Sequence, residues 1–328
     1  MKLTIVLASY NGARFIDEQI QSIQAQTIQD WLLLIRDDGS SDDTVARVRK
    51  LAQTDNRIVL LNDGSGNLGV TQNFARLLQV ALNGDADYVA MADQDDVWHS
   101  EKLKILLDKM QNMELRATST IPILVHSDLE VVDEVMTTIN PSFMDYAGIS
   151  PTSPRLGQLL CQNIVTGCTC LINRKLLEQA LPVPREVPLH DWWLALLALS
   201  RGEIGYVEQT LVRYRQHENN VVGVKYSLAR AVGYLMKPAN WIQLVNAVHS
   251  SILQANLLIE RLYDLNAGLR NGNRLGVIEL YASLETLPRI QRWKILTENK
   301  IYKRSNISNY IFVLIVLSLP LNTNHRQR

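Results

Sequence analysis

The first half of the chain alternates between short, almost wholly apolar runs and longer segments in which apolar residues recur at helical spacing. An apolar run of this kind predicts a strand that is buried on both faces. These runs are LTIVLAS at 3–9, WLLLIRD at 31–37, RIVLLN at 57–62 and YVAMA at 88–92. The segments between them predict helices over about 13–26, 42–51 and 70–81. This alternation predicts an α/β fold, a mostly parallel sheet with helices on both faces.

The alternation loosens after about residue 122. We expect a long strand at 123–133, a mobile Pro- and Ser-rich loop at 140–154, a strand that turns into a helix at 163–181, and a helix at 190–200. Beyond about Tyr226 the pattern is mostly helical, with a break at Lys237-Pro238. The chain therefore divides into an α/β region over 1–225 and a helical region over 226–328.

Polar residues follow each of the first four predicted strands. They are Ser9-Tyr10-Asn11, Asp37-Asp38, Asn67, and the acidic stretch Asp93-Gln94-Asp95-Asp96. In open parallel sheets, ligands bind beyond the carboxyl ends of the strands. Polar loops also occur there without a function, but acids after two of the four strands favour a shared binding site.

The stretch DQDD at 93–96 crowds three carboxylates into four residues. One aspartate suffices to cap the following helix, so capping leaves two unexplained. A solvated acidic turn is one alternative. A divalent cation is the better explanation, because Mg²⁺ and Mn²⁺ prefer carboxylate, phosphate and water oxygens. We therefore predict a Mg²⁺ or Mn²⁺ site at this turn.

Composition narrows the class of protein. The chain has 328 residues, of which 47% are hydrophobic, with 33 basic and 33 acidic side chains, so a folded core is expected and a nucleic-acid partner is not. Three cysteines, Cys161, Cys168 and Cys170, suggest buried thiols rather than a disulfide framework or a zinc site. The chain begins directly with a strand-like run instead of a signal peptide, which predicts a cytoplasmic location.

Two common nucleotide-binding motifs do not occur where they would bind a nucleotide. No GxGxxG follows the first strand, and no GxxxxGK[ST] occurs. A diphosphate held by a metal, without a glycine-rich cradle, points to an enzyme that uses a nucleotide sugar.

The ordered set SYNGARFIDEQIQSIQAQT, IRDDGSSDDT, NLGVTQNF and ADQDDVW resembles the family 2 inverting glycosyltransferases of the GT-A fold. Together with TGCTCLINRKLL, LHDWW and YRQHENNVVG, DQDDVW is similar to the bacterial rhamnosyltransferase branch of that family. The resemblance covers roughly residues 1–225, which it implies are the catalytic domain.

The resemblance implies roles for individual residues. Asp38 accepts a hydrogen bond from the base, Asp95 is the metal ligand of the DXD motif, and Asp93 faces the ribose or the metal. Asp96 shares or replaces the role of Asp95, because DQDD leaves the register uncertain by one residue. His217 is a third metal ligand or a diphosphate contact. The residues expected to contact the nucleotide sugar are Ala8, Ser9, Tyr10, Asn11, Asp38, Asn67, Asp93, Gln94, Gly167 and Trp192.

Displacement at the anomeric carbon requires a base that deprotonates the acceptor hydroxyl. Asp191 matches the family's base position at the start of a helix. The family often has Glu-Asp there, and this chain has His190-Asp191, which makes His190 the rival base. A plain N-cap aspartate is the structural alternative. Of Trp192 and Trp193, we expect one to be buried and one to line the pocket.

The C-terminal region suggests contact with a membrane. Six basic residues lie between 289 and 304 against one acid, Glu298, and the apolar segment YIFVLIVLSLPL follows at 310–321. That segment is too short to span a bilayer. A basic helix beside an apolar one suits docking on an anionic membrane, although a terminal core helix gives the same pattern.

The sequence thus predicts inverting sugar transfer from a nucleotide diphosphate donor to a hydroxyl of a growing, lipid-linked glycan. Branch resemblance implies dTDP-L-rhamnose as the donor and an O-antigen or capsule intermediate as the acceptor, at the inner face of the cytoplasmic membrane. UDP-GlcNAc, UDP-Gal or UDP-Glc needs the same motifs. A nucleotidyltransferase normally carries a basic, glycine-rich loop where this chain has SYNGARF, and a non-catalytic glycan-binding protein remains a further alternative.

Overall fold

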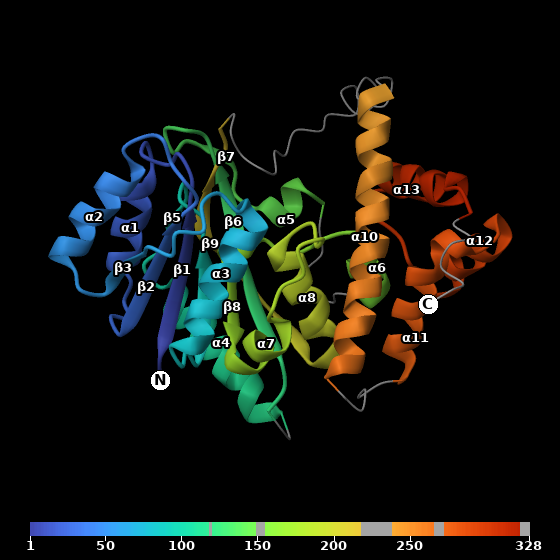
Figure 1. Ribbon diagram of the computed structural model, residues 1–328, viewed down its shortest axis with the longest axis horizontal. Coiled ribbons are helices and arrows are strands. Elements are labelled where there is room, and N and C mark those ends of the chain that lie inside the picture. The colour runs from blue at the N-terminus through green and yellow to red at the C-terminus, as the bar shows by residue number, and fades with distance from the viewer. Residues whose placement is uncertain (118–119, 149–154, 218–237, 266–271, 322–328) are drawn as a thin grey trace. The chain divides into compact units, whose positions relative to one another are not determined.

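The computed structural model describes residues 1–117, 120–148, 155–217, 238–265 and 272–321 (Figure 1). The chain forms two compact units. The first contains Met1–Tyr146, Val165–Arg185 and Leu189–Asn220, and the second contains Ala147–Ile164, Glu186–Pro188 and Val221–Arg328. The boundary expected near residue 225 and the residues Asn219 and Asn220 lie outside the described residues.

The first unit begins with the predicted βα repeats. The strands are β1 (Leu3–Ser9), β2 (Trp31–Asp37), β3 (Ile58–Leu61) and β4 (Tyr88–Ala92). The helices between them are α1 (Ile16–Gln24), α2 (Thr44–Thr54) and α3 (Val70–Asn83). β1 pairs in parallel with both β2 and β4, and β2 pairs in parallel with β3. The parallel half of the sheet is therefore confirmed.

The second half of this unit makes the sheet mixed. It adds the strands β5 (Val97–Trp98), β6 (Ile123–Val132), β7 (Thr138–Asn140), β8 (Cys170–Asn173) and β9 (Glu203–Arg215). The order is β3-β2-β1-β4-β8-β6-β9-β5, with β7 beside β6. β8 runs antiparallel to β4 and β6, whereas β9 is parallel to β6 and antiparallel to β5. Because β9 pairs with β5, and β5 follows β4 directly, the end of β9 lies next to the acidic turn after β4. Residues from the start and the end of the region that carries the motifs are therefore neighbours.

Helices cover both faces of the sheet. Leu3, Ile5 and Leu7 of β1 point to one face, where they belong to one buried cluster with residues of α1, α2 and α4 (Lys102–Arg116). α3 packs against β1 and β2, and Figure 1 shows it in front of the sheet. Apolar residues on both faces explain the continuous hydrophobic runs, because each buried side chain of this size contributes about 1.5–3 kcal/mol.

Several shorter elements depart from the expected pattern. β5 and β7 fall where no strand was expected, and the stretch expected as a loop at 140–154 includes the short helix α5 (Phe143–Tyr146). Residues 149–154 of that stretch lie outside the described part of the chain. The remaining helices of the first unit are α7 (Arg174–Ala180) and α8 (His190–Arg201), with the 3₁₀ turn η1 (Gly167–Thr169) before β8.

The second unit is helical, as expected for the C-terminal region. Its helices are α6 (Leu156–Cys161), α10 (Pro238–Asp264), α11 (Gly272–Ala282), η2 (Ser283–Thr286), α12 (Arg289–Glu298) and α13 (Asn306–Ser318). By length and composition α10 is apolar enough to cross a membrane over Asn240–Asp264, a test that core helices also pass. It buries Val248, Ile252 and Leu258 within this unit, where it packs against α11 and α13.

Candidate active site

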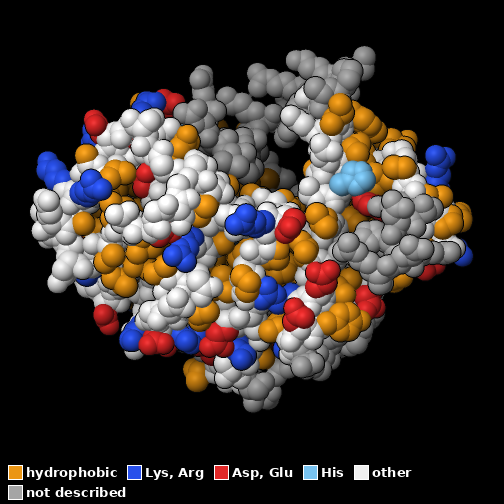
Figure 2. Space-filling model, in the orientation of Figure 1, with side chains coloured by type: hydrophobic (Ala, Val, Ile, Leu, Met, Phe, Trp, Pro, Cys, Tyr) orange, Lys and Arg blue, Asp and Glu red, His pale blue; other side chains and the backbone are white. Residues whose placement is uncertain are grey.

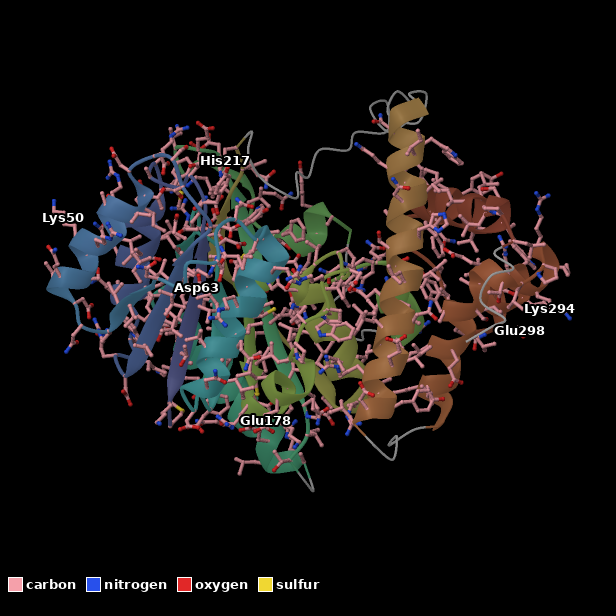
Figure 3. The ribbon with its side chains drawn as sticks, in the orientation of Figure 1. Lys50, Asp63, Glu178, His217, Lys294 and Glu298 are labelled. Carbon is pink, nitrogen blue, oxygen red and sulfur yellow. The ribbon has the colours of Figure 1, made fainter. Side chains whose placement is uncertain are left out.

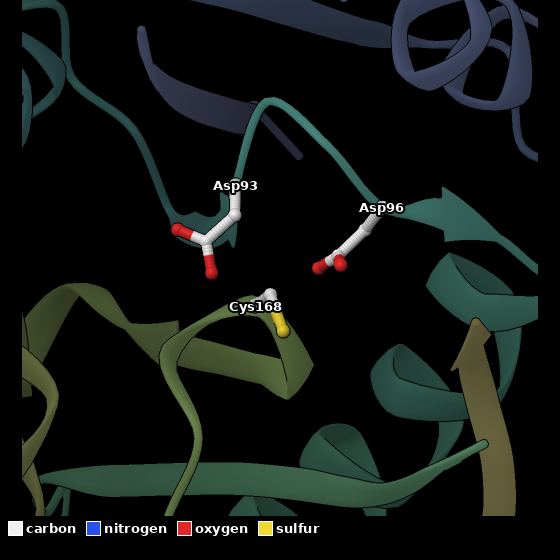
Figure 4. Close-up of side chains that lie close together, drawn as sticks. All are labelled: Asp93, Asp96 and Cys168. Carbon is white, nitrogen blue, oxygen red and sulfur yellow. The ribbon is translucent and has the colours of Figure 1, made fainter. Parts of the chain in front are cut away.

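The acidic turn begins where β4 ends at Ala92. Asp93, Asp96 and the thiol of Cys168 in η1 lie with one potential ligand atom of each within 4.8 Å of the others. Figure 4 shows the two carboxylates facing each other beside Cys168. Asp96 is fully buried, and its Oδ2 atom has no hydrogen-bond partner among the described residues. A buried oxygen without a partner is costly, so this carboxylate is suited to a ligand.

Crowding and burial raise the pKa values of Asp93 and Asp96. Burial, followed by repulsion from Asp95 and Asp191, raises the pKa of Asp93 to about 7. Burial and the charges of Asp95 and Asp93 raise the pKa of Asp96 well above its usual range. The repulsion between Asp93 and Asp191 also shows that the acidic turn and the start of α8 share one electrostatic environment.

Asp95 points toward a different partner. Its Oδ2 atom lies 2.8 Å from Nε2 of His217, which follows β9. The imidazole of His217 also stacks on the ring of Phe15, with ring centroids 5.3 Å apart. Figure 3 places His217 at the carboxyl end of the parallel strands. Asp95 and His217, both expected as metal ligands, are therefore neighbours, whereas Asp93 and Asp96 face Cys168.

Arg215 is a buried residue of this site that the sequence did not reveal. Its Nε atom donates to the carbonyl oxygen of Asp95 at 3.0 Å, and its backbone N–H donates to Oδ1 of Asp96 at 3.4 Å. Its guanidinium also pairs with Glu18 of α1 at 2.5 Å and lies over the ring of Phe15. Arg215 thus fixes the acidic turn to α1 and to the end of β9. In the sequence it is one of several arginines near strand ends, so no local signal distinguished it.

The turn after β1 is joined to the acidic turn through Gln94. The Gln94 side chain accepts from the backbone N–H of Tyr10 at 2.8 Å and donates to the Tyr10 carbonyl oxygen at 2.9 Å. A Cβ atom at Gly12 would lie 2.1 Å from Oε1 of Gln94, so glycine is required there for this approach. Gln94 therefore orders the turn, while the Tyr10 side chain is exposed.

The rest of that turn is held by residues that follow β2. Ser9 donates to Asp37 Oδ1 at 3.0 Å, and the backbone N–H of Asn11 donates to Ser40 Oγ at 2.8 Å. Asn11 has a φ of 49° and accepts from the backbone N–H of Ser41 at 2.8 Å. Asparagine is among the few residues that tolerate this left-handed conformation. Ala8 lies partly buried at the end of β1.

The side chain of Asp38 forms hydrogen bonds with the loop that contains Asn67. Its Oδ1 accepts from Arg36 at 2.8 Å and from the backbone N–H of Leu68 at 2.7 Å, and its Oδ2 accepts from the N–H of Gly69 at 2.8 Å. The exposed Asn67 donates to the Asp38 carbonyl oxygen at 2.9 Å. The two residues expected near the base are thus neighbours, with Asp38 buried as the support of the loop.

Asp191 lies in the first turn of α8, where backbone amides hold both of its oxygens. Oδ2 accepts from the N–H of Gly167 at 2.9 Å, and Oδ1 accepts from the N–H of Trp192 at 2.6 Å. A Cβ atom at Gly167 would lie 3.0 Å from Nε2 of His190 and 3.5 Å from Cβ of Asp191. Gly167 therefore permits this close approach, and its expected contact with the donor stays a prediction.

His190 lies in an apolar environment. It stacks on Phe74 with ring centroids 4.0 Å apart, and neither ring nitrogen has a hydrogen-bond partner among the described residues. Burial lowers its pKa to about 3. A neutral, buried imidazole of this kind is a packing residue and a poor proton acceptor near neutral pH.

The two tryptophans that follow are both buried. Trp193 is inaccessible and donates through Nε1 to the Ala180 carbonyl oxygen at 3.0 Å, and Trp192 is 9% exposed. One of them was expected to be buried, and both are, because α8 is buried along almost its whole length. The expected place of the other at the pocket stays a prediction.

The acidic turn fits the implied divalent cation. Carboxylate oxygens of Asp93 and Asp96 lie together, one of them has no hydrogen-bond partner in the described part of the chain, and Asp95 of the same turn contacts His217. Oxygen-rich sites of this composition favour Mg²⁺ or Mn²⁺, whereas one thiol among carboxylates is an unusual zinc set. All three cysteines are free and buried, as expected.

Comparison with known proteins decides the family. The model of glycosyl transferase family 2 matches residues 4–179, more than half of the chain. The chain belongs to this family. It is a glycosyltransferase, and its fold is GT-A.

Curated relatives and solved structures agree with this assignment. The chain is 27% identical over 226 residues to the dTDP-rhamnosyl transferase RfbG of Shigella flexneri, covering 67% of this chain and 75% of that protein. It is 26% identical over 235 residues to the Escherichia coli UDP-Glc:alpha-D-GlcNAc-diphosphoundecaprenol beta-1,3-glucosyltransferase WfgD, covering 68% and 81%. The crystal structure of S. aureus TarS 1–349 in complex with UDP-GlcNAc superposes with a TM-score of 0.53 at 15% identity, covering 97% and 90%.

Proposed function

We propose that this family 2 enzyme transfers L-rhamnose from dTDP-L-rhamnose, with inversion, to a hydroxyl of a lipid-linked surface polysaccharide such as an O-antigen or capsule intermediate. The observation that supports the reaction type is the cluster of Asp93 and Asp96 beside Cys168, which directly follows Gly167, the residue whose backbone N–H donates to Asp191 at 2.9 Å. The donor is supported by the similarity to RfbG, and the lipid-linked acceptor by the similarity to WfgD.

In the proposed reaction Asp191 is the general base. Its carboxylate is oriented by the amides of Gly167 and Trp192, and it takes the proton of the acceptor hydroxyl in the proposed reaction. His190 is a weaker candidate, because its ring is stacked on Phe74 and stays neutral.

The leaving diphosphate needs a compensating charge at the acidic turn. We assign Asp95, Asp93, Asp96 and His217 as the groups that would hold Mg²⁺ or Mn²⁺ there, where the ion would supply positive charge next to the diphosphate. Asn67 and the Ala8–Asn11 turn, ordered by Gln94 and Asp38, form the proposed nucleoside side of the site.

A UDP-sugar is the second candidate donor, favoured by the UDP-Glc named for WfgD and the UDP-GlcNAc bound to TarS. A panel of dTDP-L-rhamnose, UDP-Glc, UDP-Gal and UDP-GlcNAc with Mn²⁺ separates the two. Binding at a concentration of 100 times Kd stabilises the folded state by about 2.7 kcal/mol, so we expect a rise in Tm with dTDP-L-rhamnose and release of dTDP. A rise with a UDP-sugar alone would replace the donor assignment, and EDTA controls report on the metal.

We also propose that the second unit docks on the anionic inner face of the cytoplasmic membrane. Ile290 and Trp293 of α12 are 66% and 47% exposed, beside the exposed Arg289 and Lys294. Figure 2 shows hydrophobic side chains on the visible surface of this unit with basic side chains nearby. Apolar and basic side chains on one helix face suit an anionic lipid surface.

One of the six basic residues between 289 and 304 is not available to the proposed docking surface. Arg292 is buried and donates to the carbonyl oxygens of Val316 and Leu319 at 2.8 and 2.7 Å, so it holds the end of α13 in place of meeting lipid. Phe312, Ile315 and Val316 of α13 are also buried within this unit. Part of the apolar segment at 310–321 is therefore core.

Co-sedimentation with phosphatidylglycerol vesicles tests the docking surface. We expect Lys294→Glu to weaken binding by more than about fivefold, since each basic residue near such a surface contributes about 1 kcal/mol. Trp293→Ser alone should weaken vesicle binding more than Lys294→Glu does. Leu115→Ser, at an exposed leucine of α4, is the matched control and should bind like the wild type. Equal binding by all four proteins would contradict the proposal.

A further inference from the structure

Lys102 is a buried cation between the two halves of the site. It lies in the first turn of α4 and is fully inaccessible to solvent. Its Nζ atom donates to the carbonyl oxygen of Cys168 at 2.5 Å and lies 3.2 Å from the centre of the Trp98 ring. Trp98 belongs to β5, directly after the acidic turn, whereas Cys168 belongs to η1. Lys102 thus joins two segments that are far apart in the sequence.

Such a position is costly unless the charge has partners. Burial lowers the pKa of Lys102 to about 7, while the nearby charges of Asp96 and Asp93 act in the opposite direction. Buried lysines are rare without compensating groups, and a methionine would fill the same volume without this cost. A requirement for the ammonium group at this place explains why the chain keeps it.

The hydrogen bond from Lys102 to Cys168 indicates why an ammonium group is needed at this position. Cys168 directly follows Gly167, whose backbone N–H holds Oδ2 of Asp191 at 2.9 Å. The hydrogen bond to the Cys168 carbonyl restrains the Cys168–Thr169 peptide unit, whose N–H donates to the Thr166 carbonyl oxygen at 2.9 Å. That carbonyl belongs to the same peptide unit as the Gly167 N–H that orients Asp191. The contact runs from β5 through Lys102 to η1 and then to the first turn of α8.

We infer that Lys102 is a positioning residue that locks η1, and thereby Asp191, to the segment that carries the acidic turn. This inference rests on the proposed function of Asp191. The turn after β1 is held by Gln94 and the loop containing Asn67 by Asp38, and neither of these hydrogen bonds involves Lys102 or Cys168. Lys102 should therefore matter for turnover more than for donor binding.

The test compares Lys102→Met, Lys102→Gln and Lys104→Met. Methionine removes the donor and the charge, and glutamine keeps a donor without the charge. Lys104 lies on the same helix, is exposed and pairs at the surface with Glu101, so it is the matched control. We expect Lys102→Met to lower kcat by about tenfold or more, with a change in KM for the donor of less than about twofold. Lys102→Gln should recover part of the loss.

A readout independent of turnover is amide hydrogen exchange of the peptide that contains Gly167–Thr169 in the metal-free protein. In Lys102→Met we expect faster exchange of this peptide, because η1 has lost the hydrogen bond that restrains it. In Lys104→Met we expect the wild-type exchange rate. Thermal melting checks that each variant is folded. Should Lys102→Met not fold, Lys102→Ala, which also removes the donor and the charge, takes its place: faster exchange with a lower kcat supports the inference, and wild-type exchange and kcat overturn it.

The outcomes separate the two proposals. If Lys102→Met matches Lys104→Met in kcat and in exchange, the role of Lys102 is wrong while the proposed function stands. If Asp191→Asn keeps wild-type turnover, the proposed base is wrong whatever Lys102 does. Faster exchange without loss of kcat would show that the link exists but does not serve catalysis, which also overturns the inference.

Discussion

Asp191→Asn is expected to lower kcat by about 10²–10³-fold, while KM for the donor sugar changes little. The amide has nearly the shape of the carboxylate and can still accept the N–H of Gly167 or of Trp192, but it cannot take a proton from the acceptor hydroxyl. Initial rates of nucleoside diphosphate release at saturating donor and acceptor measure the effect.

Two further variants make this result specific. Asp17→Asn removes a carboxylate from the first turn of another helix, α1, where it pairs with Arg47, and should retain wild-type turnover. His190→Asn tests the rival base and should cost much less than Asp191→Asn, because the imidazole is buried and neutral. Loss of turnover in His190→Asn with full activity in Asp191→Asn would transfer the role of base to His190.

The second large effect is expected at the acidic turn. Asp93→Asn should weaken Mn²⁺ binding by at least about tenfold and lower turnover by about 10² or more, because one carboxylate charge beside the ion is lost. Titration of Mn²⁺ followed by electron paramagnetic resonance measures the affinity in the absence of any sugar. Asp87→Asn, at an exposed aspartate before the start of the same strand β4, is the control.

The same site should bind Mn²⁺ in a pH-dependent manner. Burial and neighbouring charges raise the pKa of Asp93 to about 7, and the ion binds the ionised carboxylate. As the pH falls below about 7, protons compete with Mn²⁺, so the affinity of the wild type is expected to decrease. In Asp93→Asn this dependence should be weaker. An affinity that is constant between pH 8 and pH 6 would contradict the assignment of Asp93 as a ligand.

The fold was predictable where the signal is local. The runs at 3–9, 31–37 and 88–92 are buried on both faces, so their strands could be read directly from the sequence. β5 and β7 are two and three residues long and carry no periodic pattern of their own. Their pairing with β9 and β6 depends on partners far along the chain, which a local pattern does not encode.

The site divides in a similar way. The sequence motifs identified the acidic turn, the turn after the first strand and Asp191 as parts of the site. In the structure these three parts lie at one end of the sheet. Lys102 and Arg215 were missed. For Lys102 a signal existed, because it occupies the same helical stripe as Leu106 and Met110, which are buried. A charged residue on an apolar stripe marks a buried charge with a partner elsewhere.

By itself, the sequence determined the α/β class, the polar strand ends and the family, since apolar periodicity and ordered motifs are properties of short segments. Only the tertiary structure decided that Asp96 faces Asp93 and Cys168 while Asp95 faces His217. It also decided that Arg292 is core and that Lys102 reaches η1. Such contacts join residues tens to more than one hundred positions apart, and burial is set by all the elements that pack around a side chain. Their energies therefore depend on the assembled molecule, because a charge is stabilised or repelled by whatever the fold brings beside it.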